Sequence, residues 1–426
     1  MSDRPDAVEI LKKLISIPSP YYEEDEICTY LEGQLKELGF SVQRQEVRRT
    51  VITGGEAREL VNFNVLGEKG SGEKSFLLYA HIDTVPVVKA WKDMGLDPFE
   101  PVERNGTIVG LGACDMKGGA AAILRAAQTI VPEGYKLKVV FGIDEENVSA
   151  GANVLVKSDF IKDCVGCIVP EVGTGRTPSS YGKLILGRHG RCSVGVRIRG
   201  RAAHASTPEH SVNPIIYALE LIESMEWIDT GSDMDLPPGN MSVASINSGI
   251  GGLSSPEECS VWFDFLYSPP RTSTDLICDV RRILRIMNEK YIVEPVTGEK
   301  HDRPESMPSY QLINPLEEPI EGFGRMPMRA TPFQEPYKTD IEHPLVKCGM
   351  ESVQEILNME PEICYGKSNA DENTLSAFMP ILVIPPVGGN EHQAGEYVEK
   401  KSLEVVAQLI ESTVTKYMSA GVFEKQ

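Results

Sequence analysis

The chain of 426 residues is long enough for two domains, and its hydrophobic fraction of 41% is ordinary for a soluble globular protein. Its 62 acidic and 42 basic residues give a formal net charge of −20, which argues against nucleic acid as a partner because phosphate binding needs a basic face. No segment is apolar over the length of a bilayer, so we expect no membrane partner. Nine scattered cysteines and a start without a signal-peptide pattern indicate free thiols in the cytoplasm.

The chain up to Glu171 alternates predicted helices with predicted strands. Apolar residues at helical spacing or in short continuous runs, separated by Pro and Gly, define these elements. The segment 89–108 is expected to be a loop. Such alternation predicts a mainly parallel sheet with helices on both faces. The predicted helices cover 4–17, 24–38, 120–131 and 151–156, and the predicted strands cover 40–47, 60–66, 76–80, 137–143 and 165–169.

Acidic residues and one histidine follow three of these predicted strands. In a parallel sheet, ligands gather at the carboxyl ends of the strands, so we expect these side chains to lie close together. His81 and Asp83 are two apart and point to the same side of an extended backbone. Such a pair can bind a metal through the imidazole while the carboxylate fixes the other ring nitrogen. The strand-end residues are His81, Asp83, Glu145, Glu146 and Glu171.

The pattern changes near Gly190, where polar and apolar residues begin to alternate as in half-exposed strands. Strands are expected at 191–199, 241–246 and 259–267, with helices at 213–225 and 273–291, whereas 292–339 gives no clear pattern. The α/β pattern returns with helices at 342–357, 372–378 and 402–417 and a strand at 381–384. The sequence therefore predicts an α/β domain with a mainly parallel mixed sheet sandwiched by helices, split by an inserted α+β domain. The expected boundaries are 1–189 and 336–426 for the first domain and 190–335 for the insert.

Five residues have the chemistry that a hydrolytic two-metal site needs, which is nitrogen or oxygen ligands on each ion and one bridging carboxylate. Each alone also fits an ordinary role, such as a helix cap for Asp115 or a surface turn for Glu171. Five residues of this kind at one predicted sheet edge favour a metal site instead. They are His81, Asp115, Glu146, Glu171 and His392.

Five segments resemble, in order, the motifs of the co-catalytic zinc metallopeptidase and deacylase family that includes acetylornithine deacetylase, succinyl-diaminopimelate desuccinylase, aminoacylase and glutamate carboxypeptidase. The segments are AHIDTVP at 80–86, GLGACDMKGG at 110–119, GIDEEN at 142–147, PEVG at 170–173 and NEHQAGEYV at 390–398. The resemblance implies a zinc-peptidase-like catalytic domain with an inserted lid and dimerisation domain.

The resemblance also implies a ligand arrangement. One zinc ion would lie on His81 and Glu171, a second on Glu146 and His392, and Asp115 would bridge the two. Cobalt or manganese could take the place of zinc. A cis peptide bond is implied after Asp115.

Three further roles are implied by the resemblance. Asp83 would orient His81, and Glu145 would be the general base that activates a metal-bridging water. His204, in the segment Gly200–Ser206, would contact the oxyanion and the substrate in the active site of a partner subunit. We therefore expect a homodimer, or a large closure of the lid if His204 acts within its own subunit.

The insert departs from the family pattern at two positions. Leu266 and Leu253 stand where the family often has the Arg and the Asn that bind a substrate carboxylate, and a leucine cannot bind a carboxylate bidentately. Arg271 or Arg325 could supply the missing guanidinium. Asp371, in the segment Asn369–Asp371, fits either a substrate-side position of the family or a helix cap.

We therefore expect an acetylornithine-deacetylase-like hydrolase of the amide bond in a small N-acyl amino acid or short peptide. The alternatives are a small dipeptidase or carboxypeptidase of the same family, and a non-catalytic metal-binding relative. A phosphate-binding α/β enzyme fits less well, because the glycines around Asp115 lack the Lys-Ser/Thr of a P-loop.

Overall fold

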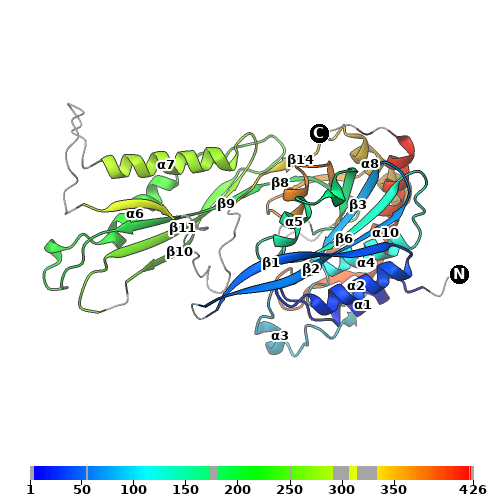
Figure 1. The fold of residues 1–426 in the computed structure, drawn as a ribbon, viewed down its shortest axis with the longest axis horizontal. Coiled ribbons are helices and arrows are strands. Elements are labelled where there is room, and N and C mark those ends of the chain that lie inside the picture. The colour runs from blue at the N-terminus through cyan, green and yellow to red at the C-terminus, as the bar shows by residue number, and fades with distance from the viewer. Residues whose placement is uncertain are drawn as a thin grey trace. The chain divides into compact units, whose positions relative to one another are not determined.

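The computed structural model describes residues 4–53, 56–172, 180–249, 252–290, 307–313, 333–421 and 423. The chain forms two compact units, one of Met1–Arg188 with Tyr337–Gln426 and the other of His189–Pro336 (Figure 1). The roles expected for them, a catalytic domain and a lid or dimerisation domain, stay predictions. None of the helices in the described ranges is long and apolar enough to cross a membrane.

In the described residues, the first unit is built on a nine-stranded mixed sheet (Figure 1). Strands β6, β3, β7 and β16 run parallel at its centre, and β1, β2 and β14 join antiparallel. All seven residues of β3 are buried, as expected for a strand covered on both faces. The α/β fold expected from the sequence is confirmed. In spatial order the strands are β1 (Ser41–Thr53), β2 (Glu56–Gly70), β6 (Lys136–Gly142), β3 (Ser75–His81), β7 (Cys164–Val169), β16 (Ile381–Val383), β8 (Lys183–Arg188) and β14 (Tyr337–Lys338), with β15 (Glu362–Gly366) beside β8.

The helices of this unit bury their apolar stripes on the sheet and on one another. Helix α4 contacts β3, α1 and α10, and α10 also packs on α8. Asp6 begins α1 with a capping box to Glu9. The helices are α1 (Ala7–Ile15), α2 (Asp25–Glu37), α3 (Ala90–Asp93), α4 (Lys117–Ala127), α5 (Ala150–Leu155), α8 (Pro344–Leu357), α9 (Asp371–Leu375) and α10 (Lys400–Ala420).

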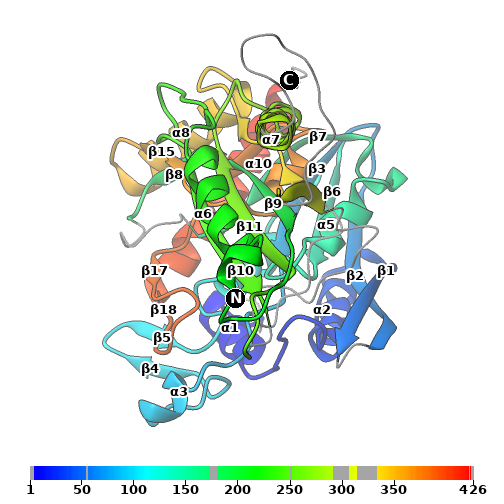
Figure 2. The same cartoon turned by 90° about the vertical axis from the view of Figure 1, so that its left-hand side faces the viewer.

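The second unit is an antiparallel sheet with two helices on one face, α6 (Pro214–Met225) and α7 (Ser273–Glu289) (Figure 2). Alternate residues of β9 enter the core under these helices, and the residues between them lie on the other face. Strand β10 is at the edge of the sheet and has no buried residue. The strands in order are β10 (Asn240–Ser248), β11 (Glu258–Tyr267), β9 (Gly190–Arg199) and β12 (Ser309–Ile313), with β13 (Phe333–Gln334) beside β9.

Several short elements were not expected from the sequence. The predicted loop 89–108 contains α3 and part of a small sheet, and β8 and β15 join the main sheet where no strand was predicted. Elements of two to six residues carry too little periodicity to be recognised. The small sheet consists of β17 (Gly388–Gly389), β18 (Tyr397–Glu399), β5 (Thr107–Val109) and β4 (Val102–Arg104).

Candidate metal centre

The five residues expected as metal ligands lie together in the first unit. His81 ends β3, Glu146 and Glu171 follow β6 and β7, Asp115 precedes α4, and His392 lies in the loop between β17 and β18. They form two groups that share one member, and within each group the candidate ligand atoms lie within 4.8 Å of one another. The groups are His81, Asp115 and Glu171, and Asp115, Glu146 and His392.

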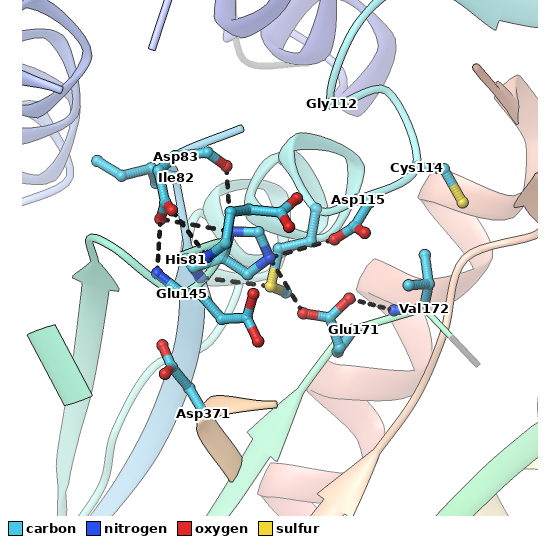
Figure 3. Close-up of polar contacts among 12 residues, drawn as sticks. His81, Ile82, Asp83, Gly112, Cys114, Asp115, Glu145, Glu171, Val172 and Asp371 are labelled. Carbon is cyan, nitrogen blue, oxygen red and sulfur yellow. Dashed lines mark hydrogen bonds and ion pairs between the residues drawn. The ribbon is translucent and has the colours of Figure 1, made fainter. Parts of the chain in front are cut away.

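Asp115 directs its two carboxylate oxygens to different groups. His81 Nε2 is 3.2 Å from Asp115 Oδ1 and 3.2 Å from Glu171 Oε2 (Figure 3). His392 Nε2 is 3.2 Å from Asp115 Oδ2 and 2.9 Å from Glu146 Oε2. A carboxylate with one oxygen in each group is what a ligand shared by two ions requires. The peptide bond between Asp115 and Met116 is cis.

The donor set of each group fits a divalent transition metal. Each group offers one imidazole nitrogen and two carboxylates, which suit zinc, cobalt and manganese. The cluster attracts positive charge. Burial, followed by repulsion from Asp115, raises the pKa of both Glu146 and Glu171 to about 7. Hydrogen bonds to Asp115 and Glu146 raise the pKa of His392 to about 12. A cation at this place would relieve the repulsion among these acids.

Asp83 connects the end of β3 to the turn after β6. Its carboxylate accepts the main-chain N–H of Glu145 at 3.2 Å and of Glu146 at 3.0 Å. His81 Nδ1 lies 3.1 Å from the main-chain oxygen of Asp83 and 3.6 Å from its Oδ1. Donation from Nδ1 to that carbonyl leaves Nε2 as the candidate ligand nitrogen. The orienting contact of Asp83 therefore comes mainly from its backbone, while its side chain fixes the Glu145–Glu146 turn.

Glu145 belongs to neither ligand group, although it neighbours Glu146. Its carboxyl lies beside His81, on the side where Asp371 is found (Figure 3). Burial raises the pKa of Glu145 well above its usual value, His81 opposes this shift, and Asp371 adds to it. Because this carboxyl group lies next to both ligand groups and belongs to neither, it is placed to exchange protons with a reacting molecule.

Comparison with known families decides the identity of this arrangement. The model of peptidase family M20/M25/M40 matches residues 77–416. The chain belongs to this family. The family resemblance expected from the sequence motifs is confirmed, and so is the expectation of a metal-dependent hydrolase of amide bonds.

Individual relatives of this M20 family chain support the assignment. It is similar to a succinyl-diaminopimelate desuccinylase of Nitrosospira multiformis, at 24% identity over 96% of this chain and 97% of the relative. Its fold resembles a tripeptidase of Staphylococcus aureus, with a TM-score of 0.72 and 18% identity over 97% of this chain and 98% of that one. It also resembles a dinuclear metal-binding M20 peptidase of Bacillus subtilis, with a TM-score of 0.65 and 12% identity over 98% of both chains.

Asp371 does not cap α9, which corrects one of the two interpretations of its segment. Ala370 is the N-cap residue, and the side chain of Asn373 bonds to its N–H. Asp371 is instead buried, with Oδ2 accepting the hydroxyl of Tyr79 and Oδ1 without a hydrogen-bond partner in the described part of the chain. Arg188 is also buried, and it bonds to Glu372, the residue after Asp371, and to the main-chain oxygen of Val172. The sequence did not indicate this buried pair.

His204 lies in the second unit, in the loop after β9. Its side chain borders a cavity of about 350 Å³ that Ile216 and Tyr217 of α6 also line. Ser206 contacts Nδ1 twice, through its hydroxyl at 2.7 Å and its main-chain N–H at 3.2 Å. Because the main-chain N–H can only donate, Nδ1 is an acceptor, and the proton of the neutral ring is on Nε2.

Leu266 leaves the substrate carboxylate without a guanidinium partner, and Arg191, which the sequence did not indicate, is a candidate for that role. Arg271 pairs with Asp279, and Arg325 lies outside the described residues. Directly opposite Leu266, on β9, is Arg191. Its Nε bonds both oxygens of Asp264, at 2.8 and 3.1 Å, and its two terminal nitrogens have no partner among the residues that the structure describes. Leu253 is 75% exposed.

Proposed function

We propose that this M20 family chain is a two-metal amidohydrolase that removes the acyl group of an N-acyl amino acid, or cleaves a short peptide. The observation that carries the proposal is Asp115, which gives one oxygen to each of two ligand groups, with Glu145 beside them. The family and the desuccinylase and peptidase relatives support an amide bond as the target. Among these activities we favour an N-acyl amino acid deacylase, as expected from the sequence.

Zinc is the metal we propose, held by His81, Glu171, Asp115, Glu146 and His392, and cobalt and manganese suit the same donors. Ions in such sites polarise a carbonyl group and lower the pKa of a bound water. The protein holds the five ligand side chains on separate strand ends and loops. It places among them the carboxylate of Glu145, which is not a ligand.

Glu145 is the proposed general base and general acid. It accepts a proton from the attacking water at one carboxylate oxygen and returns it to the nitrogen of the leaving amine. The Asp83 carboxylate fixes the main chain of Glu145 and so keeps its side chain in reach of both partners. Burial raises the pKa of Glu145, which makes its carboxylate a stronger proton acceptor.

His204 is the proposed donor to the oxyanion of the tetrahedral intermediate. Its Nε2–H is available for this role because Ser206 occupies Nδ1. We further propose that Arg191 binds the carboxylate of the substrate with its two terminal nitrogens, while Asp264 holds its Nε in place. This assignment makes a free carboxylate part of the substrate.

A homodimer through the second unit is the assembly we propose. Strand β10 leaves its outer edge unpaired in the described chain and buries none of its residues. On α6, Ile216 and Leu219 are 60% and 59% exposed, and Ile246 of β10 is 46% exposed. Pairing two β10 edges would cover these side chains. Light scattering should give the mass of two chains for the wild type. It should give the mass of one chain for Leu219→Glu.

The experiment that tests the proposed function is a hydrolysis screen with chelator-treated and metal-reloaded enzyme. The substrates are N-acetyl and N-succinyl amino acids, dipeptides and tripeptides, each with its carboxamide analogue. We expect metal-dependent hydrolysis, and a preference for the free carboxylate that Arg191→Lys reduces by about 10- to 100-fold in kcat/KM. Arg197→Lys, a change on the same strand, is the matched control. Hydrolysis that survives complete metal removal would contradict the proposal.

The non-catalytic alternative predicts a different result in the same screen. A relative that has lost its catalytic activity would bind metal at the ligand groups and would hydrolyse none of the substrates. The proximity of Glu145 to both groups favours the enzyme, because a protein that only binds metal has no need of a buried unligated carboxylate there. The expected cytoplasmic location stays a prediction.

A further inference from the structure

Glu396 is a buried acid of the first unit that the proposed mechanism does not use. It lies in the loop between β17 and β18, four residues after His392, and its side chain is 1% exposed. A buried carboxylate costs free energy unless hydrogen bonds compensate for its lost hydration. Its contacts therefore indicate what it stabilises.

All its side-chain bonds go to one loop of the main chain. Glu396 Oε1 accepts the N–H groups of Cys114 at 2.8 Å and Asp115 at 2.9 Å, and Oε2 accepts that of Gly112 at 2.9 Å. Its own main-chain oxygen accepts the N–H of Gly110 at 3.0 Å. One residue thus fixes the backbone of 110–115 at four points.

This loop and the loop of Glu396 each carry a proposed ligand. Asp115, at the end of the first loop, serves both ligand groups, and His392 belongs to the second loop. Within the second loop, the Asn390 side chain donates to the main-chain oxygen of Gly395, which ties the histidine turn to Glu396. The two loops also pair as strands where Tyr397 lies opposite Val109.

We propose that Glu396 is a positioning residue of the metal centre, which holds the backbone of Asp115 so that each of its two oxygens faces one ligand group. Without Glu396, the N–H groups of Gly112, Cys114 and Asp115 would lack the acceptor that they have in the structure. This inference rests on the proposed function, because it assumes that the ligand groups bind metal.

The test is the change Glu396→Gln, which keeps the size of the side chain and replaces one carboxylate oxygen with an amide NH₂. The NH₂ group cannot accept a hydrogen bond, so a main-chain N–H loses its acceptor. We expect the dissociation constant for Co²⁺, measured by calorimetry on the metal-free full chain, to rise 10- to 100-fold, as for other residues that orient metal ligands. The visible absorption of bound Co²⁺ should change as well, because Asp115 shifts relative to both ions.

Glu404→Gln is the matched control. Glu404 also accepts a main-chain N–H, that of Ala7 at 2.9 Å, but lies on α10 away from the two loops. It should lower thermal stability without changing Co²⁺ affinity or absorption. Wild-type affinity and spectrum in Glu396→Gln would overturn the inference while leaving the proposed function intact, whereas a wild-type chain that binds no Co²⁺ would overturn both.

A second measurement applies if Glu396→Gln does not fold. Hydrogen exchange of the wild-type, metal-free protein reports whether the N–H groups of Gly112, Cys114 and Asp115 are bonded without metal. We expect them to be protected to the same degree as the strand β3 core. Exchange at the rate of a free peptide would overturn the inference, because Glu396 would then not hold the loop.

Discussion

Replacing Asp83 with Asn tests whether its side chain, which bonds to the main chain of Glu145 and Glu146, supports metal binding. The Asp83 carboxylate accepts one N–H from Glu145 and one from Glu146, through separate oxygens. In the variant one of these oxygens becomes an NH₂ group, so one bond to a charged acceptor is lost, at a cost of about 1.5–3 kcal/mol. Because 1.4 kcal/mol corresponds to a factor of ten, we expect metal affinity to fall by about 10- to 100-fold.

The assay is competition of the purified variant with a chelator of known zinc affinity. Asp97→Asn is the control, since Asp97 also accepts a main-chain N–H, that of Phe99, but lies on the exposed loop near α3. The reasoning is refuted if Asp83→Asn binds zinc as tightly as the wild type, or if Asp97→Asn loses the same affinity.

Three further predictions address the base, a fully buried ion pair and a partly buried ion pair. Glu145→Gln should bind two metals normally and lose about 10²- to 10⁴-fold in kcat, and a near-normal kcat with metal loaded would contradict its role. Glu372→Gln should lower the free energy of unfolding by about 3–5 kcal/mol in urea titrations, because Arg188 keeps a buried charge without its partner; an unchanged midpoint would contradict this. Burial opposes ionisation of Asp163, but hydrogen bonds from Lys136 and Lys138 outweigh this effect and lower the pKa of Asp163 to about 2. Its stabilising contribution is therefore fully present above pH 4 and is lost as the pH falls through 2. Asp163→Asn should cost about 1 kcal/mol at pH 7 and only a small part of that at pH 2, where the carboxyl is half protonated. A cost that does not depend on pH would contradict this.

The proximity of the candidate ligands could be predicted because their residue types stand out at the ends of predicted strands. A buried apolar run followed by His81, and another followed by Glu171, implies nearby side chains once a parallel sheet is assumed. The central sheet brings these strand ends together as the sequence indicated. His392 lies 221 positions after Glu171 in a loop that follows a short predicted strand, and it became a candidate because its residue type completes the ligand set.

The contacts that support the ligands could not be predicted, because they depend on pairings that sequence patterns do not encode. Glu396 bonds to main-chain N–H groups more than 280 residues away, and every residue type has such a group. Recognising Arg191 requires the register of β9 with β11, since a slip of one residue would turn its side chain to the other face.

The first residue of α4 could not be predicted from the sequence either. Two glycines suggested a helix that begins after Gly119, yet α4 begins at Lys117. A Cβ atom on Gly119 would lie 2.2 Å from the main-chain oxygen of Pro170, the residue before Glu171. The glycine therefore allows the helix to approach the end of β7, a tertiary requirement that outweighs its low helix propensity.

The central claim is that two metal ions bind at ligand groups sharing Asp115 and that amide hydrolysis depends on both. The most direct test is the titration of chelator-stripped enzyme with zinc while hydrolysis of the best substrate of the screen is followed. The account predicts no activity without metal, and a rise that ends at two equivalents in the wild type. Asp115→Asn should abolish this rise. Full activity without metal, or a titration of Asp115→Asn that matches the wild type, would contradict the account.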